Sequence, residues 1–228
     1  MTQIKTGAAV LAAIAVLTSC SNDDPAATPQ AESDEPKTPS STPSATYEIV
    51  PDESGAIGAG SWAVRAEESA EVPLAVIDVP TAGFTGGERW IWTNEAVLGY
   101  WTVSGVHTDP CTRSGPAASV GDTVEDLAAA LDAQRLTTAT DPVPVAVDGH
   151  DGLYLELSTP ADLDYATCQK DGLVAWDDAP AWTEPAVTRL WILDVDGQRV
   201  VLTLNGEPTK ATERVFTGMV RSAEFVQG

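Results

Sequence analysis

One β-hairpin constrains the fold of this chain more than any other stretch. Residues 188–195 and 198–205 are two apolar runs joined by Asp196-Gly197, a favoured pair for a two-residue hairpin turn. Both runs, TRLWILDV and QRVVLTLN, carry apolar residues on both faces in places. Strands that are covered on both faces lie inside a sheet rather than at its edge. We therefore predict an antiparallel sheet with this hairpin near its centre.

The amino-terminal end carries a second strong pattern. A single positive charge at Lys5 precedes an apolar segment, residues 8–17, which is followed by small residues and Cys20. The segment is shorter than the roughly 20 apolar residues that span a bilayer. Its order of charge, apolar run and small residues is typical of a secretory signal. The sequence therefore predicts that the rest of the chain is exported.

Residues Leu17-Thr18-Ser19-Cys20 resemble the lipobox of bacterial lipoproteins, in which a Leu and two small residues precede a Cys. The resemblance implies that residues 1–19 are a signal peptide, that the Cys20 thiol receives a diacylglyceryl group, and that the protein is anchored at the outer face of the cytoplasmic membrane. Stable anchoring needs more than one acyl chain, since a single chain binds a membrane only weakly. The alternatives are an ordinary signal peptide cut near a Cys and an uncleaved anchor helix.

Residues 20–47 are expected to form a tether. From residue 21 on, the segment has no Val, Ile, Leu, Phe or Trp, and its prolines lie among Ser, Thr and acidic residues. So little apolar surface cannot offset the entropy lost on ordering, and prolines and like charges extend such a chain. We predict a disordered tether that carries one soluble domain, residues 48–228.

The remaining cysteines agree with export. If Cys20 carries the lipid, Cys111 and Cys168 are left as a pair, and outside the cytosol such a pair is most simply a disulfide. A thiol or metal site is the alternative, but the chain lacks the CxxC motif that would favour one. We predict a Cys111–Cys168 disulfide.

The net charge limits the possible partners. The formal charge is −22 at pH 7, so nucleic acid and anionic lipid headgroups repel the chain. We expect no nucleic-acid partner, and membrane association must come from the acyl chains. An excess of negative charge is compatible with cationic partners.

The domain region shows strands first and helices later. Strand-like runs occur at residues 61–65, 73–79 and 98–103, and a second hairpin pairs residues 143–147 with 153–157 around a turn. Trp90 and Trp92 should share one face of a strand, because side chains alternate along it. A helix is predicted at 121–134, where Asp122 or Thr123 can cap its start, and another at 211–221, before a short run at 223–226. This order predicts an α+β fold in which helices pack on an antiparallel sheet.

A longer succession carries a family resemblance: GHDGLYLEL, a loop with a Cys, RLWILDVDGQRVVLTL, and a helix ending in VRSAEF. It resembles exported lipoprotein domains of actinobacteria, which in turn resemble the Mog1/PsbP-type α-β-α sandwich. The resemblance covers roughly residues 98–226 and implies an α-β-α sandwich-like fold with one disulfide. Its motifs are turns, strand patterns and the Cys pair, so it implies no catalytic residue.

The sequence shows no catalytic, cofactor-binding or metal-binding constellation. The GxSxG, GxGxxG, P-loop and HExxH motifs are all missing. His107 lies in a loop-like stretch, and His150 lies at a hairpin turn between two aspartates, where neighbouring side chains rarely converge on one ion. Asp194 begins a calcium-like DVDG sequence, but a strand resumes at Gln198 instead of further oxygen ligands.

Two tryptophans lie in an unusual setting. Trp176 and Trp182 belong to the stretch AWDDAPAWTEP, which is rich in Pro and acidic residues and follows Cys168. A disulfide-anchored loop with two tryptophans can present an aromatic surface to a glycan or a peptide, so we name both as a possible ligand surface. The alternative is that both indoles fold back to cover the sheet.

Together these features predict a lipid-anchored envelope protein whose domain binds a ligand or a protein partner and is not an enzyme. One alternative is an envelope hydrolase that uses carboxylates in a cleft, which would contain an acid with a raised pKa. Another is an accessory substrate-receiving lipoprotein of a transporter.

Overall fold

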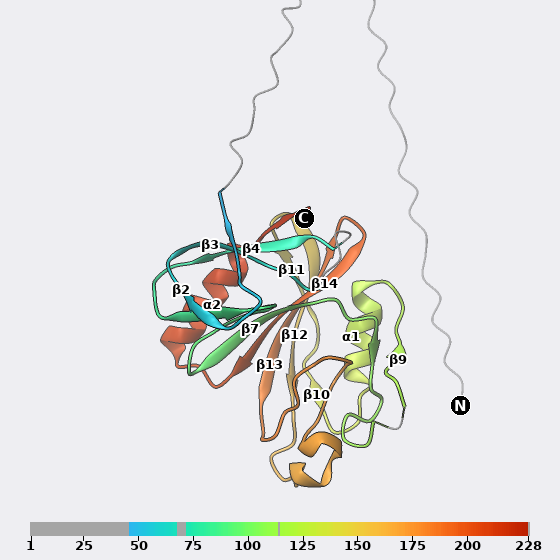
Figure 1. Cartoon of the computed structure of the whole chain (residues 1–228). Coiled ribbons are helices and arrows are strands. Elements are labelled where there is room, and N and C mark those ends of the chain that lie inside the picture. Colours follow the sequence, from blue (N-terminus) through green and yellow to red (C-terminus); the bar gives the residue numbers. More distant parts are fainter. Residues whose placement is uncertain (1–45, 68–71, 114, 228) are drawn as a thin grey trace, which may run out of the picture. The chain divides into compact units, whose positions relative to one another are not determined.

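The computed structural model describes residues 46–67, 72–113 and 115–227, which belong to one compact unit (Figure 1). Of these described residues, 41% are in strands and 15% in helices, so the fold is mostly β. The elements, in chain order, are β1 (Glu48–Ile49), β2 (Gly55–Ile57), β3 (Gly60–Val64), β4 (Leu74–Val79), β5 (Phe84–Gly87), β6 (Trp90–Trp92), β7 (Ala96–Trp101), β8 (Gly105–Val106), β9 (Ala118–Ser119), α1 (Val124–Asp132), β10 (Thr138–Ala139), β11 (Val143–Val147), β12 (His150–Ser158), the 3₁₀ helices η1 (Tyr165–Thr167) and η2 (Gln169–Asp171), β13 (Val187–Val195), β14 (Gln198–Gly206), α2 (Lys210–Arg221) and β15 (Glu224–Val226).

The largest sheet has nine strands and is organised around the predicted hairpin. Its order is β10-β12-β13-β14-β7-β6-β5-β2, with β11 also paired to β12. β13 and β14 run antiparallel, and the turn residues Asp196 and Gly197 have φ of 52° and 85°, the left-handed values that a tight hairpin turn requires. Leu190 of β13 and Leu202 of β14 are fully buried on opposite faces of the sheet. The central hairpin is therefore confirmed.

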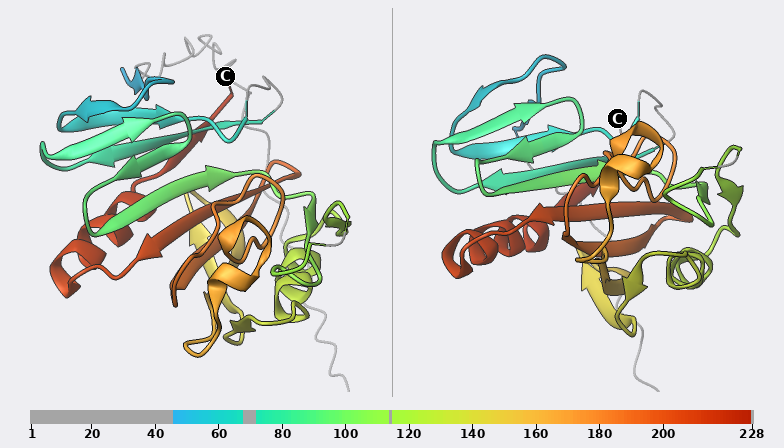
Figure 2. Two further views of the ribbon diagram at one scale, coloured as in Figure 1. Left: turned by 60° about the horizontal axis from the view of Figure 1, so that its bottom comes forward. Right: turned by 90° about the horizontal axis from the view of Figure 1, so that it is seen from below.

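A four-stranded sheet and α2 cover one face of the large sheet. The four strands follow the order β1-β3-β4-β15. The core between the two sheets includes Ile77 of β4, Leu98 of β7 and Phe216 of α2, all nearly inaccessible to solvent. Tyr100 of β7 points into this core and donates its hydroxyl to the Pro73 carbonyl at 2.9 Å. The stacked strands and α2 are visible in the two views of Figure 2.

The other face of the large sheet is covered by α1 and an irregular segment that contains η1 and η2. α1 buries the predicted stripe of Val124, Leu127, Ala128 and Leu131. Thr123 caps its start, and the Thr123 side chain and backbone exchange hydrogen bonds with Asp126, which forms a capping box. α1 and α2 thus lie on opposite sides of the domain (Figures 1 and 2).

The predicted α+β, α-β-α sandwich-like architecture is wrong. One face of the large sheet is covered mainly by a second sheet, where the prediction placed a helical layer. The error arises in residues 48–106, which form eight strands of two to six residues. Strands such as GAI and FTGG are too short and too rich in glycine to show the period-2 alternation by which strands are recognised.

Several predictions concern residues outside the described part of the chain. The signal peptide (1–19), the lipidated Cys20 and nearly all of the tether (20–47) fall there. Among the residues that are described, no helix is long and apolar enough to cross a membrane.

Candidate functional site

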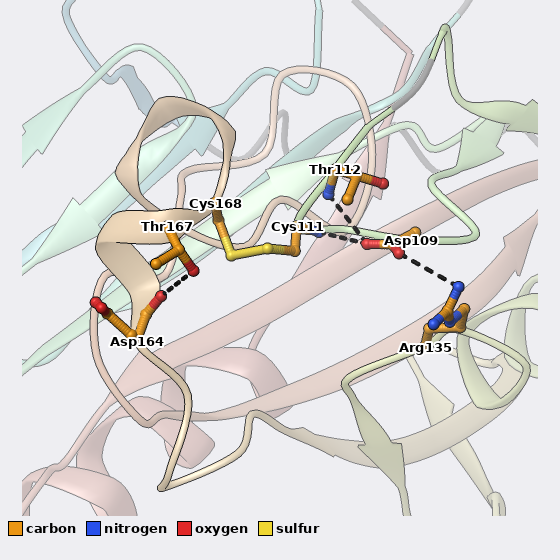
Figure 3. The surroundings of a disulfide bond; sticks show 7 residues. All are labelled: Asp109, Cys111, Thr112, Arg135, Asp164, Thr167 and Cys168. Atoms are coloured by element: carbon orange, nitrogen blue, oxygen red, sulfur yellow. Dashed lines mark hydrogen bonds and ion pairs between the residues drawn. A yellow bond between two sulfur atoms is a disulfide. The ribbon is translucent and has the colours of Figure 1, made fainter.

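The predicted disulfide between Cys111 and Cys168 is present, with the two Cα atoms 4.6 Å apart (Figure 3). It joins the loop after β8 to the junction of η1 and η2. Backbone hydrogen bonds continue the connection on both sides, from Gln169 N to the Cys111 carbonyl and from Val174 N to the Pro110 carbonyl. We call residues 164–186 the disulfide-anchored segment.

Asp109 stabilises the loop after β8, which contains Cys111. One of its carboxylate oxygens accepts hydrogen bonds from the backbone N–H of Thr112 at 3.0 Å and of Cys111 at 3.1 Å, and the other lies 3.6 Å from Arg135 (Figure 3). The Thr112 N–H, together with the Cys111 N–H and the Arg135 charge, lowers the pKa of Asp109, because these groups stabilise the ionised carboxylate.

The disulfide-anchored segment carries the two tryptophans that were named from the sequence, and the structure places them differently. Trp176 is 3% exposed and packs edge-to-face on Trp101, with ring centroids 5.9 Å apart. Its ring is therefore part of the core. Trp182 is 9% exposed and borders a cleft. Both indoles are therefore largely buried, and of the two Trp182 is the one that lines a cleft.

An apolar cleft of about 420 Å³ lies between the disulfide-anchored segment and the large sheet. We call it the aromatic cleft, and its lining residues are Trp90, Trp92, Val97, Pro180, Ala181, Trp182 and Asn205. The sheet residues come from three neighbouring strands, since Val97 of β7 is paired with both Trp92 of β6 and Asn205 of β14. As expected from their alternation, Trp90 and Trp92 share a face, and this face forms the floor of the cleft.

A glycine allows one of these indoles to lie close to the sheet. Gly99 is paired with Trp90, and a Cβ atom at Gly99 would lie 2.6 Å from the Trp90 ring. Trp90 also packs edge-to-face on the buried Trp101 at 4.5 Å between centroids. The floor of the cleft therefore continues into the core through aromatic contacts, which hold Trp90 in place.

A buried hydrogen-bond relay orients the polar side chain of the cleft. The indole N–H of Trp182 donates to the Thr188 hydroxyl at 3.1 Å, and this hydroxyl donates to Oδ1 of Asn205. Thr188 is 1% exposed, so its proton needs a protein acceptor, and the indole can only donate. Because Oδ1 of Asn205 accepts from Thr188, the amide is oriented, and its nitrogen is the donor that this side chain brings to the lining of the cleft.

The two histidines are placed away from the aromatic cleft. His107 is 4% exposed, and its Nε2 lies 3.1 Å from Asp177, so the side chain is buried although it belongs to a loop. His150 begins β12 instead of occupying the turn, and its ring packs on Phe225 at 5.6 Å. Within the described residues, no group of three or more His, Cys, Asp or Glu side chains is arranged to hold a metal ion.

Among the residues that the structure describes, the carboxyl groups whose pKa values shift are all shifted downward. Besides Asp109, hydrogen bonds from Thr209 and Thr212 lower the pKa of Glu95, and hydrogen bonds from Thr123 lower that of Asp126. Each of these carboxylates is engaged with a turn or a helix start, and none of them lines the aromatic cleft. The ionised carboxylates therefore stabilise the folded structure.

Sequence reasoning named Trp182 but missed four other residues of the cleft: Trp90, Trp92, Val97 and Asn205. The WIW pattern indicated that two indoles share a face, yet no local signal indicated that β14, about a hundred residues later, lies beside them. A scan against protein-family models finds no match to this chain, and a search of the curated proteins finds no significant relative. The interpretation of the cleft therefore depends on its geometry.

Proposed function

We propose that this protein is a lipid-anchored envelope protein whose domain binds a ligand or a protein partner at the aromatic cleft and catalyses no reaction. The supporting observation is the convergence of Trp90, Trp92 and Trp182 around one oriented amide, that of Asn205. Preformed concave sites with an apolar lining and a few placed polar groups are the usual form of binding sites. Tryptophan is also enriched among the residues that dominate binding energy.

The location is proposed from the sequence and agrees with the disulfide. The Leu17–Cys20 pattern provides the acylation site, and a Cys111–Cys168 bond is stable in an oxidising compartment outside the cytosol. In this proposal the acyl group on Cys20 holds the domain at the outer face of the cytoplasmic membrane, within reach of envelope components.

A hydrolase at the same place is not favoured by any observation. The lining of the aromatic cleft contains no carboxylate, histidine, serine or cysteine side chain. In the described part of the chain, the three carboxyl pKa values that shift are lowered, whereas a general acid that works near neutral pH needs a raised one.

Cross-linking in the native envelope tests the proposal. The full-length chain, its Trp92→Ala variant and a Val143→Ala control would be compared in intact cells, because Val143 is 54% exposed and lies on β11, outside the cleft. We expect the same cross-linked species with the native and control chains and its loss with Trp92→Ala. A species that survives Trp92→Ala unchanged excludes the cleft as the binding site.

Lipid anchoring is tested separately. We expect a radiolabelled or alkyne-tagged fatty acid to be incorporated into the native chain and not into Cys20→Ala. The Cys20→Ala chain should also leave the membrane fraction. Retention of that variant in membranes without label would exclude the lipid anchor.

A further inference from the structure

The hydrogen-bonding character of the aromatic cleft points to a class of ligand. The lining side chains are almost wholly apolar, and Asn205 is the one that carries both a donor and an acceptor. Oδ1 of Asn205, the one side-chain acceptor of the lining, already accepts from Thr188. The indole N–H of Trp182 is also used, because it donates to Thr188. The amide nitrogen of Asn205 is therefore the oriented donor that the lining offers to a ligand.

We propose, building on the function above, that the aromatic cleft binds a proline-rich segment of another envelope protein in the polyproline II conformation. Proline has no N–H and so brings no donor that the cleft would leave unpaired. The carbonyls of a polyproline II segment make no internal hydrogen bonds, so one of them can accept from the amide nitrogen of Asn205. Aromatic-lined grooves recognise such segments in a similar way.

A glycan fits this lining less well. Each sugar hydroxyl is both a donor and an acceptor, and hydroxyls that are buried against this almost wholly apolar lining remain unsatisfied. Stacking on Trp92 or Trp182 would favour a sugar ring, but it would not supply the missing hydrogen-bond partners. An ordinary extended peptide has the same difficulty at every backbone N–H.

The floor of the cleft suits a proline ring. The Trp90 ring lies over Gly99 and the end of the Trp92 ring reaches Gly87, so the two indoles lean toward opposite neighbouring strands. A proline ring can pack on the apolar surface that they form. On a polyproline II segment, residues three apart repeat on one face every ~9 Å, so a second proline can reach the Trp182 side of the cleft.

Charge favours a segment with basic residues. The chain has a formal charge of −22, and the exposed Glu184 and Glu207 each lie two residues from a lining residue, Trp182 and Asn205 respectively. Lys or Arg beside the prolines would be attracted by this surface. The chain's own proline-containing stretch, residues 21–47, is acidic, so charge disfavours it as the occupant.

Titration of the purified full chain in detergent tests the ligand class. The probe is a synthetic peptide with Pro-Pro-Lys repeats, followed by tryptophan fluorescence and calorimetry. The comparison ligands are the same peptide with Ala at the Pro positions and a chitohexaose oligosaccharide. We expect saturable binding of the proline peptide and at least a tenfold weaker affinity for the alanine peptide.

The decisive variant is Asn205→Asp, which can still accept from Thr188 but replaces the donor of the cleft with an acceptor. We expect it to weaken binding of the proline peptide at least tenfold, whereas Val143→Ala leaves the affinity unchanged. Urea unfolding of both variants verifies that they are folded. Equal affinity of Asn205→Asp and the native chain would overturn the proposal.

The outcomes also separate this inference from the proposed function. Saturable binding of chitohexaose instead of the peptide, lost in Trp92→Ala, would overturn the proline-rich ligand and leave the cleft as the binding site. Failure of the proline peptide to bind, together with Trp92-dependent cross-linking in cells, would also overturn the proline-rich ligand and leave the cleft as the binding site. Failure to bind together with Trp92-independent cross-linking would overturn both.

Discussion

The indole N–H of Trp182 donates to the hydroxyl of Thr188 across 3.1 Å, and this bond fastens the disulfide-anchored segment to the strand that follows it. The same hydroxyl orients Asn205 on the neighbouring strand β14. One buried hydroxyl therefore sets both the wall of the aromatic cleft and the direction of its amide. The shape of the site and its hydrogen-bonding character are linked through a single residue.

Replacing this hydroxyl should lower stability. Thr188→Val keeps the side-chain volume but leaves the Trp182 N–H and Asn205 Oδ1 without their partner. We expect the free energy of unfolding to fall by about 1–3 kcal/mol, the usual cost of an unsatisfied buried polar group. Urea unfolding would measure the loss, and Thr183→Val, at an exposed position of the same segment, is the matched control. Equal stability of the two variants would show that the relay contributes nothing.

Removing the disulfide should lower stability further. Cys111 and Cys168 are 57 residues apart, and the entropy of the closed loop in the unfolded chain corresponds to about 4 kcal/mol. A double Cys111→Ser, Cys168→Ser chain should therefore unfold at a much lower urea concentration than the native chain. A reducing agent should shift the native chain in the same direction and leave the double variant unchanged. Equal urea midpoints for the native chain and the double variant would contradict the prediction.

Acid should weaken the loop that Asp109 organises. The pKa of Asp109 is lower in the folded chain than its ordinary value of 3.8, so its ionised form favours folding. The stabilisation is complete above the unfolded pKa and is lost as the pH falls through the lowered folded pKa. We expect Asp109→Asn to be less stable than the native chain at pH 6 and equal to it near pH 2. Urea unfolding across this pH range would show a constant difference if Asp109 played no such role.

Which features could be predicted depends on how far apart in the sequence the interacting residues lie. The hairpin at Asp196-Gly197 and the helix capped at Thr123 were predictable, because turn residues, caps and apolar periodicity act within a few residues. The disulfide was predictable from the compartment and the even number of remaining cysteines. In each case the information lies in a short stretch of sequence or in a simple count.

The second sheet and the cleft depend on longer-range pairing. β2 and β5 are short and contain glycine, and they become strands because their neighbours supply backbone partners. The cleft requires Trp92, Trp182 and Asn205 to meet from three distant parts of the chain. The alternation of side chains along a strand placed Trp90 and Trp92 on one face. It could not identify Trp182 and Asn205 as the residues that line the cleft with them.

Gly99→Ala should disturb the floor of the cleft from beneath. A Cβ atom at Gly99 would lie 2.6 Å from the Trp90 ring and 2.9 Å from Nε1 of Trp101. Trp101 is 1% exposed and cannot yield, so the half-buried Trp90 must tilt into the cleft. We expect a loss of about 1–3 kcal/mol in the free energy of unfolding, as for other overpacked sites, and a shift in tryptophan emission. Gly58→Ala is the control, since its Cβ would meet no atom within 4 Å. If Gly99→Ala matches Gly58→Ala in both stability and emission, Trp90 does not rest on the sheet as described.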